Sequence, residues 1–153
     1  MAAMSAVVPP DLHYRSLERM YLGAPTNQIY RNLTITIADA TARIGVDVTP
    51  DLHHAAGALH GAHLFKLLDD AAFFAANSVV TDVFVLTAQF SVQMLAQATE
   101  GTIHAHGTLL RAGSSLLFAE SVVRSGEREL ARGHGTFARS RQVLTQVPGY
   151  GAP

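Results

Sequence analysis

Asp69 stands in a setting that indicates chemistry. It lies within residues 59–76, an apolar stretch with the length and composition of a helix. At about 100° per residue, the helical face around Asp69 holds alanine and phenylalanine side chains and no cation. The neighbouring Asp70 falls on a different stripe, where Lys66 precedes it by one turn and can pair with it. Asp69 is therefore predicted to be the unpaired carboxylate of the two.

An unpaired carboxylate among apolar groups destabilises the fold by several kcal/mol or takes a raised pKa, because its charged form loses hydration. Two interpretations of Asp69 follow. The helix can rotate slightly, so that the carboxylate reaches water or a backbone donor. Alternatively, Asp69 is a functional carboxylate in a partly dry pocket, a setting typical of catalytic groups. We favour the second interpretation.

The residues that precede Asp69 form a motif. Residues 54–62 read His-Ala-Ala-Gly-Ala-Leu-His-Gly-Ala, and residues 65–69 read Phe-Lys-Leu-Leu-Asp. This order resembles the signature of hotdog-fold acyl-CoA thioesterases, most closely the phenylacetic-acid-degradation (PaaI-like) group. The pattern of that group is Asn-x-x-Gly-x-x-His-Gly-Gly, followed by a helix with Phe-x-Leu-Ala-Asp. Two positions depart from it, since His54 replaces the Asn and Ala62 replaces the second Gly. The resemblance extends over residues 30–140.

The resemblance implies an α+β hotdog fold, in which an antiparallel β-sheet wraps around one long central α-helix. It also implies an acyl-CoA substrate and a homodimer or homotetramer with active sites at subunit interfaces. Asp69 then acts as nucleophile or general base on a thioester held by Gly61 of the partner subunit. A glycine N–H at a helix N-terminus suits this role, because it is unpaired, favours negative charge and lets a carbonyl approach closely. The alternative is a glycine kept only for packing of the turn.

Two further residues belong to the expected catalytic group. Thr87 matches a position where related enzymes carry a Ser or Thr that orients the attacking water. Simple strand alternation, however, puts Thr87 on the face opposite Leu86 and Ala88, away from the helix. It would then reach the site only at an interface or through a β-bulge. His54 can donate one hydrogen bond from a neutral imidazole to the water or the carbonyl. An ordinary strand threonine and a loop histidine without a role are the alternatives.

Four residues are expected to bind the substrate without taking part in the reaction. His60 and Ala62 flank Gly61, and His60 is expected to tie down the turn through a backbone hydrogen bond. Gly113 and Ser114 lie where the family often has Gly and then a basic residue near the CoA phosphates. Because Ser114 occupies the basic position, an ordinary hairpin turn is the alternative at this site.

Two other functions fit parts of the pattern. Hotdog hydratases and dehydratases also act on acyl thioesters, but they carry a His and a carboxylate in a differently spaced motif. An acyl-thioester binding or sensing module is the alternative without catalysis, and the departures at His54, Ala62 and Ser114 leave it open. Release of free thiol from acyl-CoA distinguishes a thioesterase from such a module.

Size and composition restrict the class of protein. The 153 residues fit one domain, 1–153, with an N-terminal extension (1–29), a core (30–140) and a C-terminal tail (141–153). A 48% hydrophobic fraction supports a packed core, and a net charge of -1 gives no basic surface for nucleic acid or an anionic membrane. No membrane span or signal peptide is evident, so a cytoplasmic protein is expected.

Cofactor chemistry is not indicated by the composition. Without Cys, thiolate catalysis, disulfides and Cys-based zinc sites are excluded. The histidines 53, 54, 60 and 63, with 104 and 106, invite a metal interpretation, but no acidic residues organise them. We expect no metal and no other cofactor.

The pattern of hydrophobic residues predicts the elements that position these groups. Residues 10–21 form a partial amphipathic helix, and residues 61–77 form the long apolar helix. Strands are predicted at residues 30–38, 40–48, 83–94, 102–111, 115–123 and 128–139. The last four strands are expected to form an antiparallel meander that covers the apolar helix. The chain is expected to end in a frayed tail from Pro148.

Overall fold

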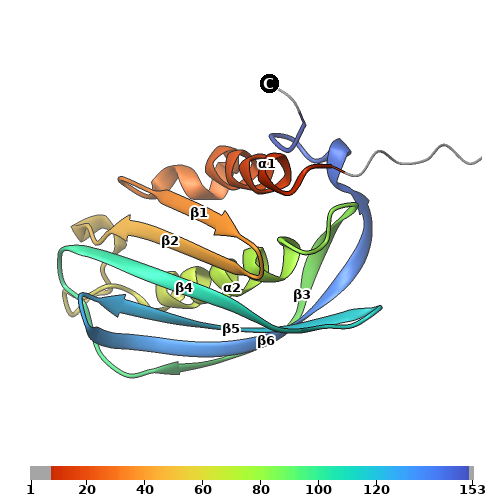
Figure 1. Ribbon diagram of the computed structural model, residues 1–153. Helices are drawn as coiled ribbons and strands as arrows, with labels where there is room; N and C mark the ends of the chain where they lie inside the picture. The colour runs from red at the N-terminus through yellow and green to blue at the C-terminus, as the bar shows by residue number, and fades with distance from the viewer. Residues whose placement is uncertain (1–7, 152–153) are drawn as a thin grey trace, which may run out of the picture.

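The computed structural model describes residues 8–151. Residues 1–7, part of the stretch examined for a signal peptide, and residues 152–153 lie outside the described residues. Within the described part, a six-stranded antiparallel sheet curves around helix α2, and helix α1 packs against strand β1 (Figure 1). The elements are α1 (Pro10–Gly23), η1 (Pro25–Ile29), β1 (Thr34–Ala38), β2 (Thr41–Asp47), η2 (Pro50–Leu52), α2 (Gly61–Asn77), β3 (Val83–Met94), β4 (Thr102–Ala112), β5 (Leu116–Ser125), β6 (Arg128–Val143) and η3 (Leu144–Gln146). The predicted α+β class and both predicted helices are confirmed.

The order of the strands differs from the prediction of a simple meander. It is β1-β2-β4-β5-β6-β3, so β3 pairs with β6 and not with β4. Residues 95–101 carry the chain from β3, at one edge of the sheet, to β4, which pairs with β2 and β5. Only β4, β5 and β6 form a meander. Alternation along a strand shows which face is buried but not which strand lies beside it, so the sequence pattern could not reveal this order.

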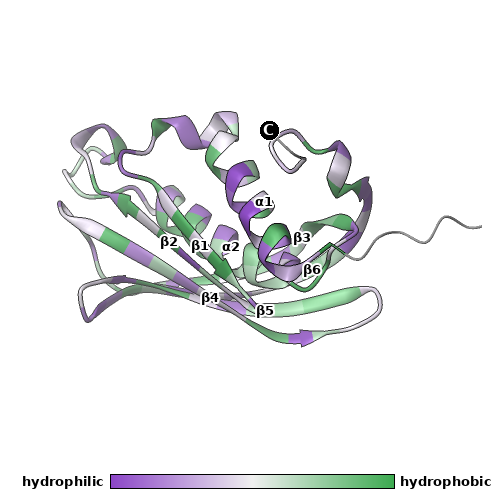
Figure 2. Ribbon diagram, turned by 45° about the horizontal axis from the view of Figure 1, so that its top comes forward, coloured by the Kyte–Doolittle hydropathy of each residue, from purple (hydrophilic) through white to green (hydrophobic). Residues whose placement is uncertain are grey.

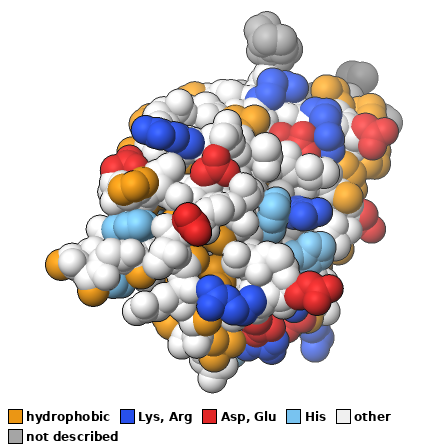
Figure 3. All heavy atoms as spheres, turned by 90° about the vertical axis from the view of Figure 1, so that its left-hand side faces the viewer, with side chains coloured by type: hydrophobic (Ala, Val, Ile, Leu, Met, Phe, Trp, Pro, Cys, Tyr) orange, Lys and Arg blue, Asp and Glu red, His pale blue; other side chains and the backbone are white. Residues whose placement is uncertain are grey.

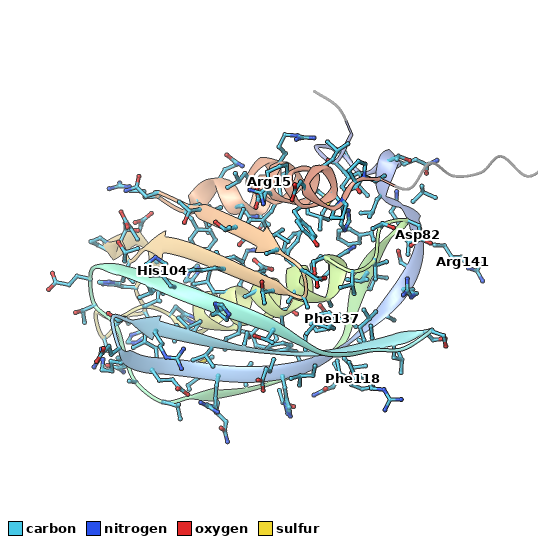
Figure 4. The ribbon with its side chains drawn as sticks, in the orientation of Figure 1. Arg15, Asp82, His104, Phe118, Phe137 and Arg141 are labelled. Carbon is cyan, nitrogen blue, oxygen red and sulfur yellow. The ribbon has the colours of Figure 1, made fainter. Side chains whose placement is uncertain are left out.

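Polar and apolar residues are mixed along the strands (Figure 2), and on β5 exposed and buried residues alternate from Leu116 to Ser121. Phe137 on β6 is fully buried and points toward α2, whereas Phe118 on β5 points away and is 40% exposed (Figure 4). The concave face therefore forms the core with α2. On the face of the molecule in Figure 3, acidic and basic side chains are interspersed rather than gathered by sign. Along residues 8–151, no helix has the length and apolar character needed to cross a membrane.

Helix α2 lies close to the centre of the sheet. A Cβ atom at Gly107 on β4 would overlap the carbonyl group of Ala71, so only glycine permits this approach. On β5, the buried Ser121 hydroxyl donates a hydrogen bond of 2.6 Å to the carbonyl oxygen of Leu68. These two contacts fix the position of the helix on both sides of Asp69.

The C-terminal turn, residues 147–150, is packed, so the predicted frayed tail is wrong as far as Tyr150. Tyr150 is 4% exposed, and its hydroxyl lies 2.6 Å from Nδ1 of the fully buried His13 on α1. The other ring nitrogen of His13, Nε2, lies 2.9 Å from the carbonyl oxygen of Asn77. Because that oxygen can only accept, Nε2 carries the proton and the Tyr150 hydroxyl donates to Nδ1. One buried histidine thus joins α1, α2 and the end of the chain.

Candidate active site

Asp69 lies in the middle of α2, half-buried, with one direct hydrogen-bond donor. The Thr87 hydroxyl on β3 donates to Asp69 Oδ1 at 2.8 Å. Burial raises the pKa of Asp69 above its ordinary value of 3.8, while the hydrogen bond from Thr87 acts in the opposite direction. Within residues 8–151, no cation lies within ion-pair distance of Asp69. The predicted unpaired carboxylate is thus present and is oriented by a hydroxyl group.

Thr87 reaches Asp69 because β3 is irregular. Strand alternation predicted that Thr87 faces away from α2, and that prediction is wrong. The pairing of β3 with β6 shifts between Thr87 and Gln89, so that Ala88 is an extra residue in the strand. Such a β-bulge reverses which residues face the helix, and bulges are common next to active sites. After the bulge, Phe90 faces the helix, where its ring packs against Phe65.

Asn77 holds the two elements of this pair together, a role that the sequence analysis missed. It is the last residue of α2 and is fully buried. Its Nδ2 atom donates to the carbonyl oxygens of Val80 and Val83, and its Oδ1 atom accepts from the Val85 N–H at 3.0 Å. The start of β3 is therefore fixed to the end of α2, two residues before Thr87. In the sequence, Asn77 indicated only a helix boundary.

Asp70 is paired as predicted. The Lys66 ammonium forms an ion pair of 2.5 Å with Asp70 Oδ2, and the Tyr21 hydroxyl donates to the same oxygen at 2.8 Å. Burial raises the pKa of Asp70, and the nearby Lys66 ammonium opposes that shift. Two adjacent carboxylates thus have different surroundings, and within residues 8–151 Asp69 is the one without an ion pair.

Gly61 is the first residue of α2, and its N–H group donates to no backbone or side-chain acceptor within the described chain. The next N–H, of Ala62, donates to His60 Nδ1 at 2.9 Å, which confirms the predicted structural role of His60. A Cβ atom at Gly61 would meet only Met94 Cε, at 3.5 Å, and the backbone there has no positive φ. Neither the turn nor the packing of this chain requires glycine at position 61.

Gly61 and Asp69 do not meet within one chain. They are eight residues apart on the same helix, which at about 1.5 Å per residue separates them by about 12 Å along its axis. A thioester carbonyl cannot contact both groups of one α2 helix at once. The structure therefore brings Thr87 to Asp69 but leaves Gly61 at a separate place.

His54 orders its own loop. Its ring Nδ1 atom accepts from the Ala56 N–H at 3.1 Å, and the backbone N–H of His54 donates to the carbonyl oxygen of Ala58 at 2.8 Å. An Asn carboxamide oxygen can accept from the N–H two residues further in the same way, so the imidazole reproduces part of the expected residue. With Nδ1 as the acceptor, Nε2 carries the proton of the neutral ring. The donation of that proton to substrate stays a prediction.

Gly113 and Ser114 lie in the turn between β4 and β5. The Gly113 N–H donates to the carbonyl oxygen of Leu116 at 2.8 Å and closes the turn, and Ser114 is exposed. Neither residue lines the cavity beside Asp69, so their contact with CoA stays a prediction. Among the described residues, no three His, Asp or Glu side chains are placed to hold a metal ion.

A cavity of about 450 Å³ opens beside Asp69. Its walls include Asp69 and Thr87 on one side and the aromatic rings of Phe73, Phe74 and Phe84 on another. A carboxylate with a raised pKa, a hydroxyl and an apolar chamber together form a site suited to the hydrolysis of an ester or thioester with an apolar acyl group.

This fold and site define a hotdog protein, because a curved antiparallel sheet wraps around a central helix that carries a half-buried carboxylate. Residues 56–132 match the model of the Thioesterase superfamily, and the chain belongs to that family. The fold is similar to that of the PaaI protein from the phenylacetic acid degradation operon of E. coli, with a TM-score of 0.75 and 18% identity over 86% of this chain and 98% of that one.

Two other solved structures have the same fold. A conserved protein from Pseudomonas aeruginosa has a TM-score of 0.74 and 24% identity, over 80% of this chain and 98% of that one. A phenylacetic acid degradation-related protein from Ralstonia eutropha has a TM-score of 0.71 and 16% identity, over 81% and 98%. No curated protein sequence matches the chain. The predicted resemblance to hotdog thioesterases of the PaaI-like group is confirmed, in its family by the model match and in its fold by these structures.

Proposed function

We propose that the protein is an acyl-CoA thioesterase in which Asp69 is the catalytic carboxylate. The contact between Thr87 and Asp69 Oδ1 carries this proposal, because it orients a half-buried carboxylate that forms no ion pair within residues 8–151. Removal of the charge from water strengthens its basicity, which is what a general base near neutral pH requires. The ionised form is needed, and Thr87 favours that form.

Two routes of hydrolysis are open to such a carboxylate. As a general base, Asp69 removes a proton from water while the water oxygen bonds to the thioester carbon, and collapse of the tetrahedral intermediate breaks the C–S bond. As a nucleophile, an Asp69 oxygen bonds to that carbon and expels the thiolate, and water then hydrolyses the mixed anhydride. Both routes yield a free acid and CoA. Rapid acid quenching and mass spectrometry separate them, because only the second route adds an acyl mass to the peptide that contains Asp69.

We infer that the second half of the site comes from a partner subunit. Within residues 8–151 the Gly61 N–H has no acceptor, and it lies at a helix N-terminus, where the helix dipole stabilises the developing oxyanion. The separation of about 12 Å along α2 requires the partner's Gly61 to serve this Asp69. Strand β3 offers the surface for pairing, since it is an edge strand of 12 residues in which Leu86 is 53% exposed. A homodimer or homotetramer follows, and a monomeric mass in light scattering at micromolar concentration would contradict it.

A panel of acyl-CoA substrates with a thiol-detecting reagent tests the proposed activity. The wild-type protein is expected to release CoA, and Asp69→Asn is expected to lose at least about 10²-fold in kcat/KM. The matched control is Asp82→Asn, because the Asp82 side chain is 74% exposed and does not line the cavity beside Asp69. Binding of acyl-CoA without release of thiol by the wild-type protein would favour a binding module. An equal loss in the control would remove Asp69 from its assigned role.

A further inference from the structure

We propose that α1, η1 and the C-terminal turn form an acyl-binding pocket beside Asp69 that selects uncharged acyl groups by size. The inference rests on the proposed thioesterase activity, since it assigns the acyl side of the same site. The cavity is bounded by Asp69 and the aromatic rings of α2, by residues 20–27 at the junction of α1 and η1, and by Val147 and Pro148. Phe84, Leu86 and Thr87 of β3 also line it, so segments far apart in the sequence together form one open cavity.

Two of these walls lie outside the part of the chain that matches the family model. That match covers residues 56–132, whereas the α1–η1 junction comes before it and the C-terminal turn comes after it. Figure 1 shows the C-terminal turn, in blue, beside α1, so that both extensions meet on the same side of α2. The matched region supplies the reacting carboxylate, and the extensions supply the surface against which an acyl group would pack.

Specific hydrogen bonds hold the α1–η1 wall in place. Tyr21 on α1 donates to Asp70, the neighbour of the catalytic carboxylate, at 2.8 Å. Asn27 on η1 is 3% exposed, and its Nδ2 atom donates to the carbonyl oxygen of Tyr21 at 2.7 Å. The junction is therefore a built wall with buried polar contacts, and its distance from Asp69 is fixed.

The C-terminal wall is held by the contact between His13 and Tyr150. The Tyr150 hydroxyl donates to His13 at 2.6 Å, and the Tyr150 N–H donates to the carbonyl oxygen of Val147 at 3.1 Å. Val147 and Pro148 are thereby kept against the cavity. Tyr150 does not line the cavity, so it acts as a positioning residue for Val147.

The charges around the cavity disfavour an acyl group that carries a free carboxylate of its own. Among the described residues that line it, Lys66 is the only cation, and its ammonium is already paired with Asp70. Asp69 would repel a further negative charge at short range. The aromatic edges of Phe73 and Phe84 instead favour an apolar acyl group. The chamber therefore suits uncharged acyl groups, such as butanoyl and octanoyl, and disfavours succinyl.

Kinetics with butanoyl-, octanoyl- and succinyl-CoA test the pocket through substitutions of Val147. Val147→Ala enlarges the chamber and is expected to raise the ratio of kcat/KM for octanoyl-CoA to that for butanoyl-CoA by about tenfold. One or two methylene groups in an apolar site change kcat/KM by about this factor. Val147→Phe fills the chamber and is expected to lower that ratio. Val143→Ala is the matched control, because Val143 is 41% exposed at the end of β6 and lies outside the cavity. An unchanged ratio in both Val147 variants, or efficient hydrolysis of succinyl-CoA, would overturn the inference.

The positioning role of Tyr150 is tested by Tyr150→Phe, which removes only the hydroxyl. We expect a higher KM for butanoyl-CoA with little change in kcat, and a shift of the acyl ratio in the direction of Val147→Ala. Tyr14→Phe is the control, because Tyr14 is the neighbour of His13 on α1 and its hydroxyl has no hydrogen-bond partner within residues 8–151. A wild-type acyl profile in Tyr150→Phe would show that Tyr150 does not position Val147. Failure of the wild-type protein to hydrolyse any acyl-CoA would instead overturn the proposed function itself.

Discussion

Replacement of Gly61 by Ala separates a catalytic role from a packing role at the start of α2. The new Cβ atom would meet only Met94 Cε, at 3.5 Å, which is an ordinary van der Waals contact. Because Ala is a better helix former than Gly and restricts the unfolded chain, the free energy of unfolding is expected to stay equal or rise by up to about 1 kcal/mol. The methyl group, however, would stand where the thioester carbonyl must approach the Gly61 N–H. We expect kcat/KM to fall by about 10²-fold, the scale observed when one oxyanion donor is lost.

Two measurements on the same Gly61→Ala preparation decide the matter: denaturant unfolding and acyl-CoA hydrolysis. Gly151→Ala is a matched control, because a Cβ atom at that position also meets no other residue closely. A stable variant that retains activity within about twofold of the wild type would refute the oxyanion role. A variant that loses both stability and activity would show that the glycine serves the packing of the turn.

Three further predictions follow from the hydrogen bonds around the carboxylate. Thr87→Val keeps the shape of the side chain but removes the donor to Asp69, so kcat/KM should fall by about tenfold or more. Thr87→Ser keeps the hydroxyl and should retain most of the activity. Equal losses in both variants would contradict the role of the hydroxyl. Asn77→Ala leaves the Val85 N–H and two carbonyl oxygens without their partner, so the free energy of unfolding in denaturant should fall by about 2–4 kcal/mol. A fall below about 0.5 kcal/mol would show that other contacts hold β3. Because burial raises the pKa of Asp69, the folded state loses stability as the pH rises from 3.8 through that raised pKa. Asp69→Asn should therefore have a higher Tm than the wild type at pH 7, and this difference should vanish toward pH 3.8. A lower Tm for Asp69→Asn at pH 7 would show that burial does not disfavour the charged form.

Much of the architecture follows from the residue pattern, because burial on one face imposes a period on a helix or strand. The long apolar stretch became α2 with its predicted ends at Gly61 and Asn77. The pairing of Asp70 with Lys66 followed from helical spacing alone. Such local features are set by neighbours in the sequence, and so they could be predicted from it.

The features that the sequence did not reveal depend on contacts between distant segments. The edge position of β3 and the bulge at Ala88 arise from the pairing with β6. The residue pattern within one strand does not reveal which strand pairs with it. The burial of Tyr150 depends on its packing in the core and on its hydrogen bond to His13, more than a hundred residues earlier in the chain. A short Pro- and Gly-rich end resembles a loose tail until such an anchor is visible.

The rescue of activity by mixed subunits tests the central claim most directly. Asp69→Asn and Gly61→Val are each expected to be inactive alone, because each lacks one half of every interface site. In a mixed dimer, one site carries both defects and the other carries neither. With random exchange, half the dimers are mixed and half of their sites are intact, so activity should approach about a quarter of the wild-type level. Verified exchange of tagged subunits without recovered activity would contradict the assignment of Asp69 and Gly61 to different subunits.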